Sequence, residues 1–342
     1  MKLLLIDYIS PQGHIIFDHI HIQALLSAGY DLHLVGRKGQ FADFVNKGLV
    51  TITEIPEKYY RYYKRFYSLM ERIKGVLSLF WIKKNLNLRN FDGIVFLSYD
   101  ILSLYFFRTS VAVYLINHNN VDQFNSRIKL SMTRDLPSNF IQIALNDYME
   151  DELKRLLPKR KVCFVPHGFL EPTNAGLRPK FINDGDRFIF CPVNRNYDSA
   201  IINDIIQSAT FKEYLNQNRI QLYIKSQLCQ APEGNIRLLP YLSEAEYNYM
   251  LSNAVGVILP YGGDFRYRCS GILFECVARN TPILATERKA LKIYKDEIDI
   301  HYFDSVHSLL DAIDVIKSAE KKCNNYNIDK FQPLPYWKGI LG

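Results

Sequence analysis

The sequence has few of the features that mark secreted, zinc-binding or membrane-spanning proteins. Its 342 residues include six cysteines, scattered without a C-x-x-C pair and without the histidine spacing of a zinc site. We therefore expect reduced thiols, no bound metal and a cytoplasmic protein. No stretch approaches the roughly 20 apolar residues of a membrane-spanning helix. The first residues, MKLLLID, are too short for a signal-peptide core and predict a strand instead.

The length and the pattern of apolar segments indicate a two-domain α/β protein. A chain of 342 residues with 48% hydrophobic residues can form two separate cores. Short apolar runs alternate with amphipathic segments in both halves, so we predict two doubly wound Rossmann-like domains facing a cleft. The predicted divisions are an N-terminal domain at 1–170, a linker containing Pro and Gly at 171–186, a C-terminal domain at 187–322 and a tail at 323–342.

The stretch at 255–286 is the most informative part of the chain. It reads as a strand, a polar loop, a helix that Ser270 can cap, and a second strand that begins after Pro282. In a parallel sheet, the loop at the carboxyl end of a strand is a ligand position, and the N-terminus of the following helix favours an anion. The stretch therefore predicts a site for a diphosphate.

A family resemblance appears within this stretch. The segment E-C-V-A-R-N-T-P-I, which begins at Glu275, resembles the E-A-M-A-x-G-x-P-V segment of retaining GT-B glycosyltransferases, especially the large family 4. The resemblance implies that Glu275 binds the ribose of a sugar nucleotide. That family usually has a second Glu eight residues earlier and a Gly three residues after it, where this chain has Tyr267 and Ser270. Tyr267, Ser270 and the adjacent Gly271 are donor-site candidates, and the departure leaves the donor sugar open.

The turn S-P-Q-G-H follows the first predicted strand and precedes a predicted helix over Ile15–Ser27. It resembles the glycine-containing first loop of GT-B enzymes, which implies a donor-site position for Gly13. In inverting relatives the His after this Gly is the catalytic base, because neutral imidazole can accept a proton from a hydroxyl near neutral pH. His14 holds that place, and a helix-capping role is the alternative.

A polar cluster, N-H-N-N, follows the apolar run at 111–116. Such a cluster at the carboxyl end of a strand is a ligand position in this architecture. Many retaining GT-B enzymes similarly have a His after this strand that contacts the donor sugar, so the resemblance implies that role for His118. A histidine that serves only its own loop is the alternative.

Two cations, Arg195 and Lys225, follow the first two strands predicted in the second domain. In family 4 enzymes, an Arg and a Lys at comparable strand ends clamp the donor diphosphate and neutralise the charge that develops on the leaving group. The resemblance implies this role here, with Asn194 as a neighbouring contact, and ordinary surface cations are the alternative. Tyr241 is a candidate for stacking on the nucleobase, or else a core residue. As in GT-B enzymes, the tail is expected to return to the first domain.

The stretch at 57–91 carries most of the chain's positive charge. It has nine Lys and Arg against two Glu, an excess of +7 that equals the net charge of the whole protein. Its many aromatic residues suit the interface of an anionic bilayer, where each basic residue contributes about 1 kcal/mol. No nucleic-acid motif accompanies the charge. We expect a peripheral contact with the inner face of the membrane, similar to that of GT-B enzymes of surface-polysaccharide assembly. A solvated helix with its aromatic residues in the core is the alternative.

These features favour transfer of a sugar from a nucleotide-diphosphate sugar to a hydroxyl of a glycan or lipid-linked acceptor, with retention. No cofactor or metal is expected, because the D-G-D at 184–186 lies in the linker and precedes a strand rather than following one. Two alternatives stay open: a nucleotide-sugar 2-epimerase of similar fold, and a non-catalytic nucleotide-sugar-binding subunit. The donor base, the sugar, the acceptor and the linkage are not defined by the sequence.

Overall fold

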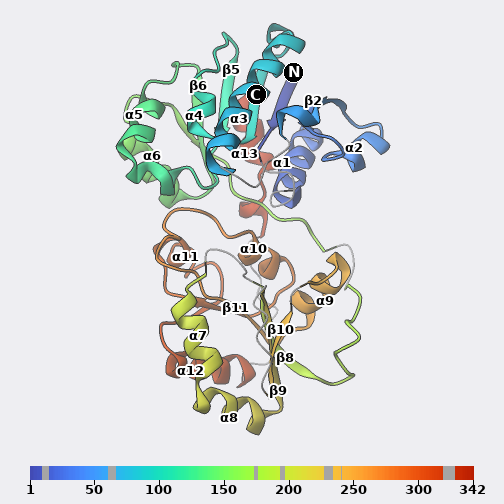
Figure 1. The fold of residues 1–342 in the computed structure, drawn as a ribbon, viewed down its shortest axis with the longest axis vertical. Coiled ribbons are helices and arrows are strands. Elements are labelled where there is room, and N and C mark those ends of the chain that lie inside the picture. The colour runs from blue at the N-terminus through green and yellow to red at the C-terminus, as the bar shows by residue number, and fades with distance from the viewer. Residues whose placement is uncertain are drawn as a thin grey trace. The chain divides into compact units, whose positions relative to one another are not determined.

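The computed structural model describes residues 1–9, 15–60, 67–172, 176–192, 197–226, 234–239, 241–318 and 328–342. The chain forms two compact units (Figure 1). Unit 1 contains Met1–Gly168, Tyr267–Cys269 and Lys330–Gly342, and unit 2 contains Phe169–Arg266 and Ser270–Asp329. The predicted α/β class is confirmed, since each unit is built on a parallel sheet with helices between its strands.

Unit 1 has a seven-stranded sheet in the order β3-β2-β1-β4-β5-β6-β7, with parallel pairing throughout. Its central strands are buried along their length, which is why their sequences are continuous apolar runs rather than alternating ones. The strand order reverses between β1 and β4, the position where ligands bind in open α/β sheets. The strands are β1 (Lys2–Asp7), β2 (Asp31–Arg37), β3 (Thr51–Ile55), β4 (Gly93–Ser98), β5 (Ala112–Ile116), β6 (Phe140–Ala144) and β7 (Val162–Phe164).

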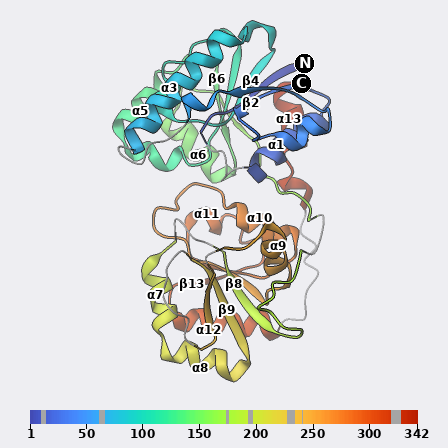
Figure 2. The ribbon, with the colours of Figure 1, turned by 45° about the vertical axis from the view of Figure 1, so that its right-hand side comes forward.

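The helices of unit 1 connect these strands by crossovers. The usual right-handed crossover places α1 and α3 on opposite faces of the sheet, as Figure 2 also shows. Helix α1 ends where the sequence predicts, and Gly29 follows it with a φ of 84°, which a residue with a side chain rarely adopts. The helices are α1 (Ile15–Ser27), α2 (Ala42–Asn46), η1 (Glu57–Tyr59), α3 (Tyr67–Asn85), η2 (Leu88–Asn90), α4 (Ile101–Leu104), η3 (Val121–Asn125), α5 (Arg127–Arg134), α6 (Asp147–Leu156) and α13 (Leu334–Leu341).

The C-terminal helix α13 completes the core of unit 1. It packs beside α1, and Trp337 is fully buried there. The indole Nε1 of Trp337 donates to Nδ1 of His21 at 3.0 Å, which joins residues 316 positions apart. Burial, together with the neighbouring His167, lowers the pKa of His21 to about 3. The His21 ring is therefore neutral and carries its proton on Nε2.

Unit 2 has a six-stranded parallel sheet in the order β10-β9-β8-β11-β12-β13. The order reverses between β8 and β11, as it does between β1 and β4 in unit 1. The strands are β8 (Arg187–Cys191), β9 (Ile220–Lys225), β10 (Ile236–Leu239), β11 (Gly256–Leu259), β12 (Ile283–Thr286) and β13 (Ile300–Phe303). The helices are α7 (Ser199–Gln207), α8 (Ala209–Asn218), α9 (Glu244–Asn253), α10 (Gly271–Ala278), α11 (Lys289–Lys292) and α12 (Val306–Ser318). The short helix η4 (Ile328–Phe331) includes the last residues of unit 2 and the first residues of the C-terminal segment of unit 1.

The helices α9 and α10 begin at side-chain caps. Before α9, Ser243 Oγ accepts from the backbone N–H of Glu246 while the Glu246 carboxylate accepts from the backbone N–H of Ser243 at 2.9 Å. Before α10, Ser270 Oγ accepts from the backbone N–H of Leu273 at 3.0 Å. Each cap pairs backbone donors that the first helical turn leaves unsatisfied. The caps therefore fix where the two helices begin, and these helices carry the polar cluster described next.

No helix in the described part of the chain is both long enough and apolar enough to cross a membrane.

Candidate functional site

The first candidate site is a polar cluster in unit 2, formed by Lys225, Tyr247, Glu275 and Arg279. Lys225 is the last residue of β9, Tyr247 lies on α9, and Glu275 lies on α10. The Tyr247 hydroxyl donates to Glu275 Oε2 at 3.0 Å, and the Lys225 ammonium lies 5.2 Å from the centre of the Tyr247 ring. Two helices and a strand end thus bring one carboxylate and two cations together.

The Glu275 carboxylate is held in an environment that disfavours its charge. Burial raises the pKa of Glu275, and the Tyr247 hydrogen bond and the charges of Arg279 and Lys225 oppose that rise. Because burial disfavours the ionised carboxylate, a further hydrogen-bond donor, such as a ligand hydroxyl, would stabilise it. The Lys225 ammonium lies against the Tyr247 ring and lowers the pKa of Glu275, so the cluster presents a positive charge beside this carboxylate.

The N-terminus of α10 lies after the loop that leaves β11. The hydroxyls of Tyr261 and Ser270 lie 2.6 Å apart in a buried hydrogen bond, and the Tyr261 ring stacks on Phe265 with centroids 4.0 Å apart. Since Ser270 also caps α10, these contacts hold the start of the helix against the end of the strand. Gly271 is the first residue of the helix.

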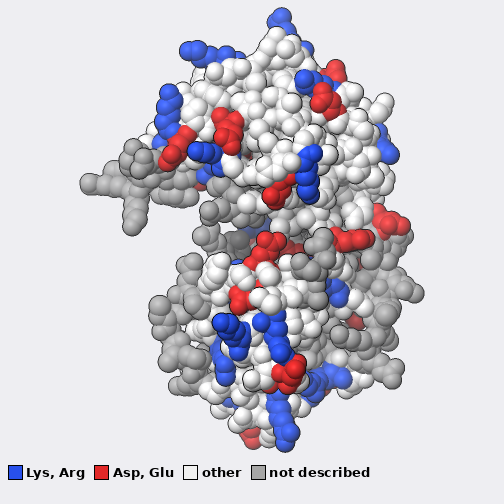
Figure 3. All heavy atoms as spheres, turned by 90° about the vertical axis from the view of Figure 1, so that its right-hand side faces the viewer, with Lys and Arg blue, Asp and Glu red and all other residues white. Residues whose placement is uncertain are grey.

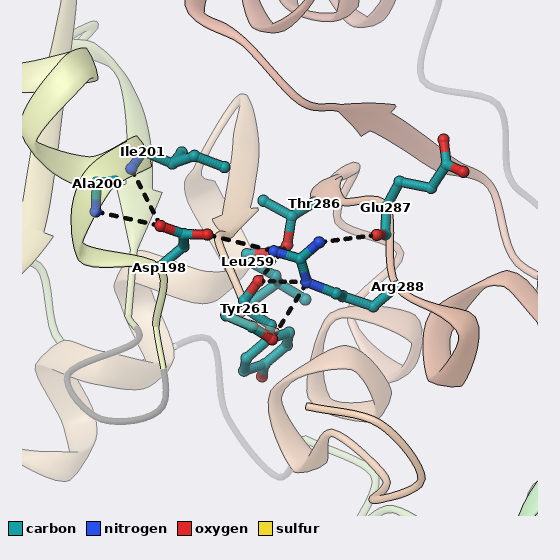
Figure 4. Close-up of polar contacts among 9 residues, drawn as sticks. Asp198, Ala200, Ile201, Leu259, Tyr261, Thr286, Glu287 and Arg288 are labelled. Carbon is teal, nitrogen blue, oxygen red and sulfur yellow. Dashed lines mark hydrogen bonds and ion pairs between the residues drawn. The ribbon is translucent and has the colours of Figure 1, made fainter. Parts of the chain in front are cut away.

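Arg288 fixes the same loop from the neighbouring strand, as Figure 4 shows. Its Nε donates to the carbonyl oxygens of Tyr261 at 2.8 Å and Gly262 at 3.2 Å, and its Nη2 lies 3.3 Å from Asp198 Oδ2. Thr286 Oγ1 donates to the Tyr261 carbonyl at 2.8 Å. Asp198 in turn caps α7. Arg288 was not among the residues predicted from the sequence, although its place just after β12 is the signal that led to the other strand-end candidates.

The second candidate site is a pocket of about 280 Å³ in unit 1, at the carboxyl ends of β1, β4 and β5. It lies at the reversal of strand order between β1 and β4, and one of its walls is helix α3. The lining residues are Tyr8, Ile9, Tyr59, Tyr60, Glu71, Arg72, Lys74, Gly75, Ser78, Ser98, Tyr99, Asp100, His118, Asn119, Asn120, Gln123 and Lys129.

The pocket contains charges of both signs. Burial raises the pKa of Glu71, and the nearby Asp100 adds to that rise, whereas Arg72 opposes it. Burial lowers the pKa of Lys129, whose ammonium donates to the side-chain oxygen of Gln123. Each group is therefore partly desolvated and can form hydrogen bonds with a polar ligand. The sequence offered one signal for this set, because Asp100 comes two residues after β4.

His118, two residues after β5, lines this pocket. Its ring packs edge-on against Phe17 with centroids 4.4 Å apart and lies 5.6 Å from the ring of His167. Phe17 belongs to α1, so this helix packs against the His118 ring. The position suits contact with a ligand in the pocket.

The remaining predicted residues are divided between the units or lie outside the described residues. Tyr241 is 79% exposed after β10, so its interpretation as a core residue is wrong. Tyr267 belongs to unit 1, where its hydroxyl donates to Glu152 at 3.0 Å and its ring stacks on that of Tyr148. Positions 61–66 of the basic stretch are outside the described residues. Four predicted site residues are also outside them: Gly13, His14, Asn194 and Arg195.

No group of three or more His, Cys, Asp or Glu among the described residues is arranged to hold a metal ion. In the predicted linker, the Asp184 carboxylate pairs with Arg178.

No family model matches the sequence, and no curated protein matches it. Its fold is similar to solved structures over nearly the whole chain. Sucrose-phosphate synthase from Thermosynechococcus elongatus has a TM-score of 0.67 at 16% identity, covering 99% of this chain and 96% of that one. UDP-GlcNAc 2-epimerase from Neisseria meningitidis, bound to UDP-GlcNAc, has a TM-score of 0.62 at 12% identity, with 100% and 98% covered. Anabaena HepE in complex with UDP-glucose has a TM-score of 0.56 at 11% identity, with 100% and 94% covered. The chain therefore has the two-domain α/β fold of GT-B proteins, in which both glycosyltransferases and nucleotide-sugar epimerases occur.

Proposed function

We propose that the protein is a glycosyltransferase that moves a sugar from a nucleotide-diphosphate sugar to an acceptor hydroxyl, with retention at the anomeric carbon. The observation that carries the proposal is the hydrogen bond from Tyr247 to Glu275, a residue of the helix that follows β11, with the Lys225 ammonium beside the Tyr247 ring. The GT-B fold supports the same class of donor, because its solved relatives include proteins bound to UDP-glucose and UDP-GlcNAc.

The donor is proposed to bind in unit 2. Glu275 would accept hydrogen bonds from the ribose hydroxyls, chiefly through Oε1, since Tyr247 occupies Oε2. Lys225 would meet the diphosphate, because an ammonium group stabilises the charge that grows on a departing phosphate. The exposed ring of Tyr241 is available to stack on the base. The remaining donor contacts are proposed to come from four residues of the same unit: Asn194, Arg195, Ser270 and Gly271.

The acceptor is proposed to bind in the pocket of unit 1. Glu71, Asp100 and Lys129 offer hydrogen-bond partners for hydroxyl groups, and His118 would contact the transferred sugar. In a retaining reaction the departing phosphate can take the proton of the attacking hydroxyl, so no separate base is required. We propose that cations of the protein, Lys225 and Arg195, supply the positive charge and that no metal or cofactor takes part.

The acceptor is proposed to be a glycan or lipid-linked glycan, which the protein reaches from the cytoplasmic face of the membrane. The support for this is the charge and aromatic content of the stretch at 57–91. No part of the proposal involves a nucleic acid.

Epimerisation of a free nucleotide sugar is the second candidate, because 2-epimerases share this fold. The two reactions differ in what they need and in what they release. A transferase releases nucleoside diphosphate only when an acceptor is present, whereas an epimerase interconverts the sugar nucleotide without one. A protein that binds the nucleotide sugar without either reaction would be a binding subunit.

A panel of nucleotide sugars, screened by thermal stabilisation, tests the proposal first. A ligand at 100 times its dissociation constant adds about 2.7 kcal/mol to the free energy of unfolding. We expect a nucleotide-diphosphate sugar to stabilise the wild type and to stabilise Glu275→Ala much less. Absence of stabilisation by every nucleotide sugar would overturn the proposal. The stabilising donor is then incubated with and without glycan acceptors, and release of nucleoside diphosphate is measured.

A further inference from the structure

Helix α3 has an apolar outer face. Its buried side chains include Lys74 and Ser78, whereas Ile73, Leu77 and Phe80 are 44%, 43% and 57% exposed. The spacing i, i+4, i+7 places these three exposed residues along one side of the helix. Leu79 and Ile82 of the same helix are buried, so α3 has apolar side chains on its covered side and also along this exposed side. Such a stripe marks a surface that binds something apolar.

A groove of about 500 Å³ at the C-terminal end of α3 supplies positive charge beside this stripe. It is lined by four cations, Lys83, Lys84, Arg89 and Arg108, together with Asn, Thr and Ser side chains and Leu, and none of its lining residues is acidic. Lys84 lies four residues after Phe80, so its charge lies on the same side of the helix as the apolar stripe. On the face of the molecule drawn in Figure 3, by contrast, Lys and Arg lie among Asp and Glu.

The inner side of the same helix lines the pocket of unit 1. Glu71, Arg72, Lys74 and Ser78 belong to the pocket wall. Helix α3 therefore stands between a polar pocket, where an acceptor is proposed to bind, and an apolar outer stripe. A ligand anchored in a lipid layer that contacts the stripe would have its polar part close to the pocket.

We propose that the outer face of α3 and the adjoining groove form a docking face for an anionic lipid bilayer. The docking face comprises Ile73, Leu77, Phe80, Lys83, Lys84, Arg89 and Arg108. Its apolar side chains enter the interfacial layer and its cations meet lipid phosphates. This inference deepens the proposed function, on which it rests for the lipid-linked acceptor but not for the contact with the bilayer.

The charges of the docking face select this occupant over a second copy of the chain. A two-fold interface places the same surface patch on both subunits, so it would set the four cations of one copy against those of the other. Like charges at close range oppose such an association. An anionic bilayer offers phosphates to the cations of the docking face and an apolar layer to its exposed apolar side chains.

Sedimentation of the full chain with lipid vesicles tests this proposal. We expect binding to phosphatidylcholine vesicles that contain phosphatidylglycerol, weak binding to phosphatidylcholine alone, and release by high salt, since exposed charges are screened over about 8 Å at physiological ionic strength. Each basic residue contributes about fivefold to binding at an anionic surface, so the triple variant Lys83→Gln, Lys84→Gln, Arg89→Gln should bind about 100-fold more weakly. The variant Ile73→Ser, Leu77→Ser, Phe80→Ser should also lose binding, including the part that resists salt.

Matched controls come from exposed positions of unit 2. Lys289→Gln, Lys292→Gln, Lys295→Gln removes the same charge from exposed lysines, and Val315→Ser removes an apolar side chain that is 54% exposed. Both controls should bind vesicles like the wild type. Equal losses in the control and docking-face variants would overturn the proposal, because the effect would then reflect net charge alone. A vesicle-free protein that is dimeric, and that becomes monomeric in the Ile73→Ser, Leu77→Ser, Phe80→Ser variant, would overturn it in favour of a second copy.

Binding of nucleotide sugars, measured without vesicles, separates this proposal from the proposed function. Vesicle binding without any nucleotide-sugar binding would reject the proposed function and leave the docking face in place. If the wild-type protein binds a nucleotide sugar but does not bind anionic vesicles, the docking face is rejected and the proposed function is not.

Discussion

Tyr247 donates its hydroxyl hydrogen to Glu275 Oε2 at 3.0 Å, joining helices α9 and α10 through the carboxylate on which the proposed donor site depends. Burial raises the pKa of Glu275, and this hydrogen bond is the largest of the contributions that oppose the rise. We therefore interpret Tyr247 as a positioning residue, since its hydrogen bond holds the carboxylate in place and favours the ionised form.

Replacing Tyr247 with Phe should raise the pKa of Glu275 further, because the ionised form loses a hydrogen bond. Donor affinity at neutral pH should fall about tenfold, since a hydrogen bond to a charged group contributes about 1.5–3 kcal/mol. The pH below which donor binding is lost should also move upward. Calorimetric titration across pH measures both effects. The control Tyr249→Phe, on the same helix, should change neither, and a Tyr247→Phe profile identical to the wild type would reject the positioning role.

Glu275→Gln should separate donor binding from stability. Because the folded-state pKa of Glu275 is raised, its contribution to stability is present at low pH and is lost as the pH rises through that pKa. At pH values above that pKa the ionised side chain thus destabilises the fold, and Gln removes this effect. We expect a higher melting temperature than wild type at such pH values, convergence of the two at low pH, and donor binding weakened by about tenfold or more. A variant that binds donor like the wild type would remove Glu275 from the site.

Lys225→Ala should reduce turnover more than donor affinity. An ammonium group that meets charge growing on the departing phosphate stabilises the transition state more than the bound donor. Loss of one such group typically costs about 10²–10³ in kcat. Steady-state kinetics with saturating donor give the comparison, with Lys295→Ala as the control at an exposed lysine. If kcat is unchanged and only KM rises, Lys225 stabilises the bound donor and the transition state equally, and the proposed role at the leaving group is rejected.

His118→Ala should be more damaging than His14→Ala. In a retaining reaction the leaving phosphate takes the proton, so a base at His14 is expendable, whereas His118 lines the pocket where the acceptor is proposed to bind and is proposed to contact the transferred sugar. The anomeric configuration of the product, read by NMR, should match that of the donor. An inverted product, together with a His14→Ala variant slowed by about 10²–10⁴-fold, would indicate general-base catalysis instead.

Local patterns in the sequence predict much of the fold. Helix Ile15–Ser27 and strand Lys2–Asp7 have the predicted bounds, because apolar periodicity and Gly29 mark their limits. The capping box of Ser243 and Glu246 and the cap at Ser270 also follow from short-range signals. These features depend on residues within a few positions of one another.

Contacts between distant residues are what the sequence could not supply. Tyr247 and Glu275 are 28 positions apart, and they meet only because α9 and α10 pack together. Composition indicated a basic, aromatic stretch at 57–91 but not which side of α3 faces outward. Lys74 is buried while Phe80 is exposed, the opposite of what their hydropathies suggest, because the fold and not the helix itself decides which side is covered.

The burial of Trp337 against α1 has a consequence for how the chain is made. Unit 1 contains strand β1, yet Trp337, whose side chain completes its core, follows the whole of unit 2 in the chain. The first 168 residues therefore leave the ribosome with the place of Trp337 beside His21 unfilled, while the whole of unit 2 is still being synthesised. Domains usually fold as units in the order of synthesis. Here the unit synthesised first reaches its final packing only after the second has been completed.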